Sequence, residues 1–190
     1  MTQNTATPAG AAAPAAQADS TNMNMLGEIV WLMAHSPLHK GWPMASIFQW
    51  VVPALMHKQC RLYRRDGRPV AYVAWARMSK EVEEGYVLNP RSLNPKDWTS
   101  GERGWIVDWI APFGDSALVM KDLREGLFKE EVGRALRVKP GSDEMQIIYI
   151  HGANAAAKAQ DPNLNPPVDL EGASKRAAHR AQLNTHAAAA

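Results

Sequence analysis

The sequence predicts an α+β fold with helices packed on a mostly antiparallel sheet, and three observations support this class. Asp66-Gly67 is a two-residue turn signal between two strand patterns, which is typical of a β-hairpin. The second of these patterns, Pro69–Ala76, is apolar on both faces and predicts a central, covered strand. Helical patterns precede and follow this hairpin, and the sequence has no internal repeat, so we expect one layered domain.

The first part of the chain predicts an extension followed by two helices. Residues 1–22 are rich in Ala, Thr, Pro and Gln and lack the basic start and Leu-rich core of a signal peptide. We expect them to be disordered. Apolar residues then recur at helical spacing over 25–34, and Pro37 ends that helix because proline disfavours helix in the residue before it. Pro43 is suited to open a second helix that continues to Leu55.

The rest of the chain predicts the remaining sheet and helices. The folded domain is expected to cover residues 23–159, and residues 160–190, rich in Ala and Pro, are expected to be largely disordered. Within the domain we expect strands over 60–65, 105–110, 135–138 and 145–150, and a turn at Pro140-Gly141 joins the last two. A helix capped by Ser79 and a loop over 89–101 precede the strand over 105–110. A helix over 116–132 follows that strand, capped by Asp115 and stopped at Gly133.

Composition excludes several classes of protein. A net charge of +2 over 190 residues is not that of a strongly basic nucleic-acid binder, and no apolar run reaches the length of a membrane span. Cys60 is the only cysteine, which excludes an intramolecular disulfide and favours a reducing, cytoplasmic compartment. The sequence contains no metal-ligand spacing, nucleophile elbow or Gly-rich phosphate loop, so we expect neither a metal nor a bound cofactor.

Two residues far apart in the chain are the candidates for catalysis. His39 lies in the Pro-bracketed connection between the first two helices, where functional side chains are often displayed. Asp108 interrupts an apolar strand, in which period two puts Trp105 on one face and Asp108 on the other. A buried carboxylate is costly unless it is paired, and a histidine that acts as a base works better when a carboxylate orients it. We therefore predict that His39 and Asp108 meet.

Other residues leave alternatives open. Ser36 precedes His39 by one helical turn, so it either forms a nucleophile pair with His39 or stabilises the turn. His151 at the end of the last strand is a weaker candidate to line a cleft. Basic residues gather around the hairpin, where they form either a solvated face or a docking patch for an acidic partner. The residues proposed for docking are Arg61, Arg64 and Arg65.

Three motifs resemble those of the toxin-activating lysine acyltransferases, which activate RTX haemolysins and cytolysins. They are SPLHKGWP at 36–43, PVAYVAWA at 69–76 and DWTSGERGWIVDWIAPFG at 97–114, and the likeness runs from about Leu26 to Gly152. The resemblance implies a variant of the GNAT acyltransferase fold. It also implies His39 and Asp108 as the catalytic residues, with a supporting role for Ser36.

The resemblance further implies a reaction and its partners. A fatty acyl group would pass from acyl–acyl carrier protein to the ε-amine of internal lysines of an RTX protoxin, in the cytosol, and the enzyme would be a homodimer. The residues agree with this chemistry. At pH 7, freeing the lone pair of a lysine whose pKa is about 10.4 costs about 4.6 kcal/mol, so a nearby base such as His39 is useful. An acyl-histidine intermediate is the rival mechanism.

Two other functions remain as alternatives at this stage. An acetyl-CoA-dependent N-acetyltransferase would use an Arg/Gln-x-x-Gly-x-Gly/Ala loop to hold the pyrophosphate, and the sequence contains none. A non-catalytic chaperone for the toxin would use the basic hairpin as its contact and would not need His39.

Overall fold

The computed structural model describes residues 14–138, 145–162, 165–172 and 174. Its helices are α1 (Pro14–His35), α2 (Ala45–Trp50), α3 (Val52–Met56), α4 (Lys80–Leu88), α5 (Ser116–Asp122) and α6 (Ala156–Gln160), with short 3-10 helices η1 (Pro90–Ser92) and η2 (Pro95–Trp98) and a π-helical turn η3 (Leu123–Leu127). Its strands are β1 (Cys60–Arg65), β2 (Arg68–Met78), β3 (Arg103–Ile110), β4 (Val132–Val138) and β5 (Met145–His151).

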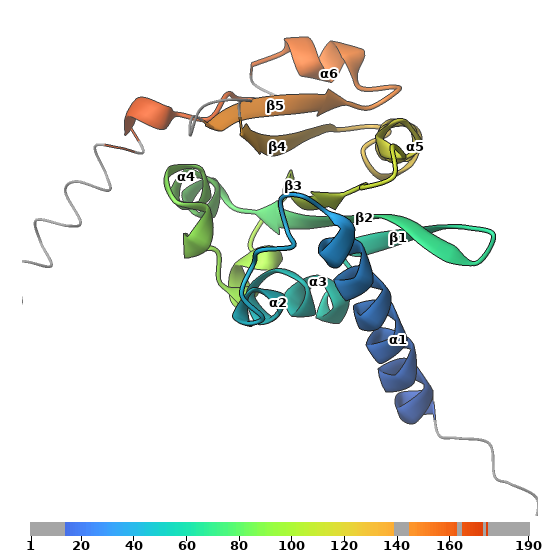
Figure 1. The fold of residues 1–190 in the computed structure, drawn as a ribbon. Coiled ribbons are helices and arrows are strands. Elements are labelled where there is room, and N and C mark those ends of the chain that lie inside the picture. The colour runs from blue at the N-terminus through green and yellow to red at the C-terminus, as the bar shows by residue number, and fades with distance from the viewer. Residues whose placement is uncertain (1–13, 139–144, 163–164, 173, 175–190) are drawn as a thin grey trace, which may run out of the picture.

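The strands form one sheet in the order β1-β2-β3-β4-β5 (Figure 1). Pairing is antiparallel from β1 to β3 and between β4 and β5. β3 and β4 are parallel, and their pairing is limited to Trp105 opposite Arg134 and Ile106 opposite Ala135. The predicted α+β class with a mostly antiparallel sheet is therefore confirmed.

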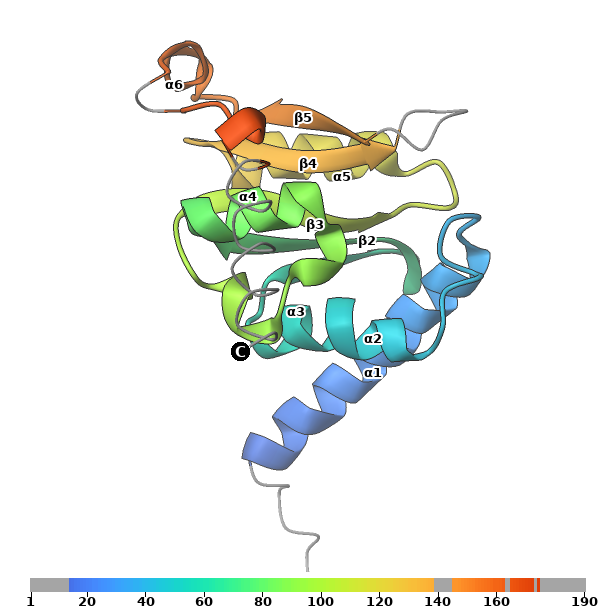
Figure 2. The same ribbon diagram turned by 90° about the vertical axis from the view of Figure 1, so that its left-hand side faces the viewer.

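Helices cover both faces of the sheet and create two apolar clusters. α1, α2, α3 and α4 pack on one face, with Tyr72 and Trp105 in the buried cluster beneath them (Figures 1 and 2). α5 and η3 cover the other face, where Val73 and Ile106 are buried with Phe128. β2 is buried on both faces, as its apolar pattern predicted.

Local signals placed several elements correctly. α1 ends at His35, two residues before Pro37, and the Asp66-Gly67 turn adopts positive φ values of 50° and 75° as a two-residue hairpin requires. The hydroxyl of Ser79 accepts a hydrogen bond from the backbone N–H of Val82, so the predicted N-cap of α4 is confirmed.

The helix α1 extends into the predicted N-terminal extension, and part of the predicted tail lies within the described residues. α1 begins at Pro14, so residues 14–22 are helical although we expected disorder; proline suits the first turn and the alanines after it are strong helix formers. Residues 1–13 lie outside the described residues. In the tail, Arg134 Nη2 donates to Asn165 Oδ1 at 2.6 Å and Val168 packs on the core, so this part of 160–190 is ordered. Residues 175–190 lie outside the described residues.

The two predicted long helices are shorter than expected. The second helix is split into α2 and α3 at Val51, just before Pro53, which has no N–H to donate back along a continuous helix. Asp115 does not cap α5 with its side chain, and the helix passes into η3 after Asp122.

Gly133 does not stop a helix, because it lies inside β4. A Cβ on Gly133 would come within 2.5 Å of the Phe128 ring, and a Cβ on Gly104 of β3 would meet the same ring at the same distance. These glycines therefore allow the ring to lie directly against the backbone where β3 and β4 pair. The predicted turn at Pro140-Gly141 lies outside the described residues.

Candidate active site

His39 is held in a tight turn between α1 and α2. The backbone N–H groups of His39 and Lys40 both donate to the carbonyl of Ser36, at 3.1 and 3.0 Å, and the N–H of Trp42 donates to the carbonyl of His39 at 2.9 Å. The imidazole lies against the Trp42 ring, with 4.5 Å between ring centroids, and only 3% of His39 is exposed. The turn therefore points the histidine into the protein instead of displaying it to solvent.

A β-bulge in β3 places Asp108. Ala74 of β2 pairs with Asp108 while the next residue, Trp75, pairs with Ile106, so Val107 is an extra residue in β3. A bulge interrupts the alternation of side chains. The predicted alternation is accordingly wrong: Trp105, Val107 and Ile110 belong to the cluster beneath α1–α4, whereas Ile106 and Trp109 face α5.

The bulge brings Asp108 to the face that the turn after α1 reaches. His39 Nε2 lies 2.9 Å from Asp108 Oδ1, and both side chains are buried. The backbone N–H of Trp109 donates to the same carboxylate oxygen at 2.8 Å, which fixes the orientation of the carboxyl group. The predicted contact between His39 and Asp108 is confirmed.

Ser36 completes a chain of three polar side chains. Its hydroxyl lies 2.7 Å from Nδ1 of His39, and Ser36 is 7% exposed. A neutral imidazole has one N–H donor and one acceptor nitrogen. Because an ionised Asp108 only accepts, Nε2 carries the proton, and Nδ1 accepts from the Ser36 hydroxyl. Serine, histidine and aspartate therefore form one directed hydrogen-bonded relay.

Two buried tyrosines lie within electrostatic reach of Asp108. Burial, together with Cys60 and the negative charge of Asp108, raises the pKa of Tyr72 well above its ordinary value, and burial and Asp108 raise the pKa of Tyr86. Both phenols therefore stay neutral around Asp108. Among the described residues, neither the Tyr72 hydroxyl nor Asp108 Oδ2 has a hydrogen-bond partner.

The three hairpin arginines are engaged with acidic groups of the same chain. Arg64 donates through Nε and Nη2 to the two carboxylate oxygens of Glu28 in α1, at 2.7 and 3.0 Å. Arg61 pairs with Asp122 at the end of α5, at 2.5 Å, and Arg65 pairs with Asp115. These arginines tie the hairpin to α1 and α5, and their part in docking an acidic partner stays a prediction.

Glu83 of α4 is a buried charged residue that the sequence analysis did not mark as a candidate. It is 1% exposed, and its carboxylate accepts from Arg103 at 2.6 Å and from the Trp105 indole at 2.7 Å. Arg134 Nε lies 3.5 Å from Glu83 Oε2, and burial lowers the pKa of Arg134. The i, i+3 spacing of Glu83 and the buried Tyr86 was the available signal that Glu83 faces inward.

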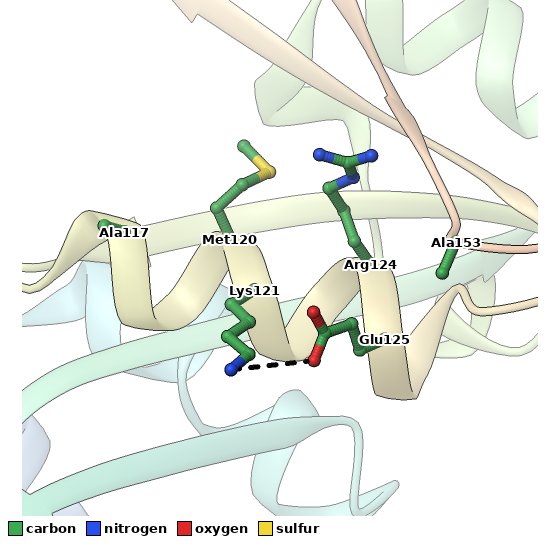
Figure 3. A pocket seen from close by; sticks show the side chains of 6 residues that line it. All are labelled: Ala117, Met120, Lys121, Arg124, Glu125 and Ala153. Atoms are coloured by element: carbon green, nitrogen blue, oxygen red, sulfur yellow. Dashed lines mark ion pairs between the residues drawn. The ribbon is translucent and has the colours of Figure 1, made fainter.

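A pocket of about 340 Å³ lies elsewhere, over α5 and η3 (Figure 3). Its walls include Met120, Arg124 and Ala153, and an ion pair of 3.9 Å joins Lys121 to Glu125 beside it. α5 covers the face of the sheet opposite to His39 and Asp108. This hollow is therefore not part of the relay. His151 ends β5 with an exposed side chain, and its carbonyl accepts from Arg124 Nε at 3.0 Å.

The described ranges contain neither a metal site nor a membrane-spanning helix. No group of three His, Cys, Asp or Glu side chains there is arranged to hold a metal ion. No helix there combines the length and the apolar character needed to cross a bilayer.

An α+β protein with a buried histidine between a serine hydroxyl and a carboxylate has the parts of a group-transfer enzyme. Comparison with known sequences identifies the kind of transfer. The sequence profile of the RTX toxin acyltransferase family matches residues 18–151. This chain belongs to the RTX toxin acyltransferase family and is an acyltransferase.

Three relatives illustrate the similarity. The RTX-II toxin-activating lysine-acyltransferase ApxIIC of Actinobacillus pleuropneumoniae is 42% identical over 141 residues, which cover 74% of this chain and 88% of the relative. The protein-lysine myristoyltransferase RtxC of Kingella kingae is 45% identical, covering 70% of this chain and 79% of the relative. The protein-lysine myristoyltransferase HlyC of Escherichia coli is 43% identical, covering 68% and 76%.

Proposed function

We propose that this enzyme moves a fatty acyl group from acyl–acyl carrier protein to lysine ε-amines of an RTX protoxin and thereby activates the toxin. Family membership and the names of the relatives support lysine acylation and toxin activation. The single observation that carries the mechanism is the relay from Ser36 through His39 to Asp108.

In this proposal the relay removes the proton of the attacking amine. The lysine nitrogen attacks the thioester carbonyl, the C–N bond forms, and the C–S bond breaks as the carrier thiolate leaves and takes up a proton. The Ser36 hydroxyl takes the proton from the amine and gives its own proton to Nδ1 of His39, which is the accepting nitrogen. Asp108 holds the tautomer and stabilises the imidazolium that forms.

The geometry favours direct transfer over an acyl-histidine intermediate. Both ring nitrogens of His39 already make hydrogen bonds, at 2.7 and 2.9 Å. Acylation of either nitrogen would break one of these bonds in a buried site, which is costly. A direct attack by lysine leaves both in place.

The remaining parts of the proposal concern fold type, assembly and location. We propose a GNAT-like fold; the support is a mixed sheet whose single parallel pair, β3 with β4, joins two antiparallel parts. No bound cofactor is required, because the carrier brings the acyl group. We also propose that the enzyme is a homodimer and that it acts in the cytoplasm. The free thiol of Cys60 is consistent with a reducing compartment.

The test is an acylation assay with acyl–acyl carrier protein and a protoxin fragment, followed by mass mapping of its lysines. We expect acyl-lysine with the natural protein and none with His39→Ala. Transfer from acetyl-CoA alone would favour a conventional N-acetyltransferase. Toxin activation by His39→Ala without any acyl-lysine would instead favour the chaperone alternative.

A further inference from the structure

The outer face of α2 and α3, together with the turn before them, carries unusually exposed apolar side chains. Among the described residues, Leu38, Met44, Phe48 and Met56 are 63%, 72%, 73% and 74% exposed, and only Met23 of the other large apolar residues exceeds 60%. Met44 and Phe48 are four residues apart and therefore lie on the same side of α2. Exposed apolar side chains on successive elements of the chain favour an interaction surface. We call these four residues the α2–α3 patch.

The chain around the α2–α3 patch contains no acidic residue. From position 29 to position 65 the sequence has neither Asp nor Glu. Lys40 and Lys58 stand at the two ends of the α2–α3 segment, and both are exposed. Neither lysine forms an ion pair with any residue that the structure describes.

A second stretch of chain adds positive charge beside the same helices. The side chain of Gln49 in α2 donates to the carbonyl of Arg91 at 3.0 Å, and that of His57 reaches the carbonyl of Pro95 at 3.3 Å. These contacts hold η1 and η2 against α2 and α3 (Figure 2), and Arg91 and Lys96 on them are exposed.

Among the described residues, Asp97 of this second stretch forms no ion pair with Arg91 or Lys96. The carboxylate of Asp97 accepts from the backbone N–H and the side-chain amide of Asn94, at 2.9 and 3.0 Å. The α2–α3 patch is therefore apolar and has a rim of four cations from two separate parts of the chain.

The α2–α3 patch also adjoins the relay. Leu38 and Lys40 flank His39 in sequence, so a partner seated on this surface lies beside the one turn that carries the imidazole. The hairpin arginines, by contrast, are occupied by Glu28, Asp115 and Asp122. We propose that the α2–α3 patch is where the acidic carrier protein docks to present its thioester to His39. This inference rests on the proposed function.

Charge complementarity is the argument for this occupant. A basic rim attracts an acidic protein and speeds its encounter, while an apolar centre supplies the contact energy. A lipid surface with anionic headgroups would use the same chemistry, and a second copy of this chain would use the apolar centre. Both are outcomes that the test distinguishes.

Two pairs of matched variants test the proposal. M44E/F48E places two charges in the apolar centre, and Leu118→Glu, at a 46% exposed position on α5 over the opposite face of the sheet, is its control. Lys58→Asn removes one charge of the rim. The backbone of Lys58 has a φ of 54°, which Asn tolerates. Lys129→Asn is the matching control at another exposed lysine. Circular dichroism and the thermal midpoint verify that each variant is folded.

Each variant is measured with two donors: acyl–acyl carrier protein and a small S-acyl-pantetheine thioester that has no protein surface. We expect M44E/F48E to raise KM for the carrier by about tenfold or more, an effect of hot-spot size, with the rate from S-acyl-pantetheine unchanged. Lys58→Asn should raise KM for the carrier severalfold at low salt and little at 0.5 M salt. Both controls should behave as the natural protein.

Binding of the holo-carrier, measured by calorimetry without any transfer, separates this inference from the proposed function. Unaltered carrier affinity in M44E/F48E would overturn the docking site even if acylation occurs. Loss of binding to phosphatidylglycerol vesicles, or dissociation of a dimer in sedimentation, with carrier affinity intact would assign the surface to lipid or to a second copy. Absence of acyl-lysine from the natural protein would reject the proposed function alone.

Discussion

His39 is almost completely enclosed, and this enclosure decides how the residue can work. A buried imidazole flanked by one donor and one acceptor has a fixed tautomer, and no ring rotation is needed before it takes a proton. Asp108 is bound by His39 and by the Trp109 N–H, so it is held in place as well. At the level of single residues, the relay is preorganised in the absence of substrate.

Replacing Asp108 with Asn tests this arrangement. Asn keeps the shape and one acceptor but loses the charge that stabilises the imidazolium, so we expect the rate of acyl transfer to fall by roughly a hundredfold or more. Initial rates with acyl–acyl carrier protein measure the effect. Asp66→Asn, a carboxylate-to-amide change in the hairpin turn at φ 50°, a conformation that Asn tolerates, is the control and should stay within about twofold of the natural rate. An unchanged rate in Asp108→Asn would contradict the orienting role.

At the scale of elements, the contact between Phe128 and the strand backbones is the sharpest packing feature. Gly133→Ala places a Cβ 2.5 Å from the ring, so we expect a loss of about 1–3 kcal/mol in the free energy of unfolding. The matched control is Gly27→Ala in α1, where nothing lies within 4 Å of the new Cβ. There alanine should stabilise by about 0.5–1 kcal/mol, because it favours helix over glycine.

Urea denaturation of the two variants measures both changes in the free energy of unfolding. Because the expected changes have opposite signs, a loss in Gly133→Ala can be assigned to the surroundings of Gly133 and not to the exchange of glycine for alanine as such. Equal changes in both variants would show that the ring does not lie against Gly133 as described.

Signals confined to a few neighbouring residues were readable from the sequence. The turn at Asp66-Gly67, the cap at Ser79 and the helix end before Pro37 depend on local backbone preferences, and each is confirmed. The pairing of His39 with Asp108 was also readable, because a carboxylate in an apolar strand needs a partner.

Features that depend on contacts between distant elements were not readable. The bulge at Val107 follows from pairing with β2, and no neighbouring residue in the sequence indicates it. The role of Gly133 depends on the ring of Phe128, just after η3, and the ion pairs of the hairpin arginines could not be foreseen because Glu28 and Asp122 are remote in sequence. In each case a tertiary contact overrode a plausible local interpretation.

At the scale of the whole molecule, burial of ionisable groups makes the free energy of unfolding depend on pH in the alkaline range. Burial raises the pKa of the Cys60 thiol from 9.0 to about 11. Between these values the unfolded chain has released this proton and the folded chain still holds it. The folded state therefore binds more protons, and the free energy of unfolding must fall as pH rises from 9 towards 11.

Cys60→Ala should remove this component. Urea midpoints measured between pH 8.5 and 10 should fall with pH in the natural protein and fall less in the variant. Above pH 10 both should decline, because the pKa values of Tyr63, Tyr72 and Tyr86 are also raised. Identical slopes below pH 10 would contradict the contribution of the thiol.

The extra residue in β3 has a consequence for how this chain tolerates changes in length. A different side chain at Val107 leaves the residue count between Trp105 and Asp108 intact, and with it the side from which the carboxylate projects. Pairing every residue of this stretch one to one with β2 at unchanged length would turn Asp108 towards α5, out of reach of the imidazole, whereas deleting Val107 would restore strict alternation and keep Asp108 on the face of Trp105. The extra residue therefore allows Trp105 and Asp108, which are three positions apart, to project from the same face of β3.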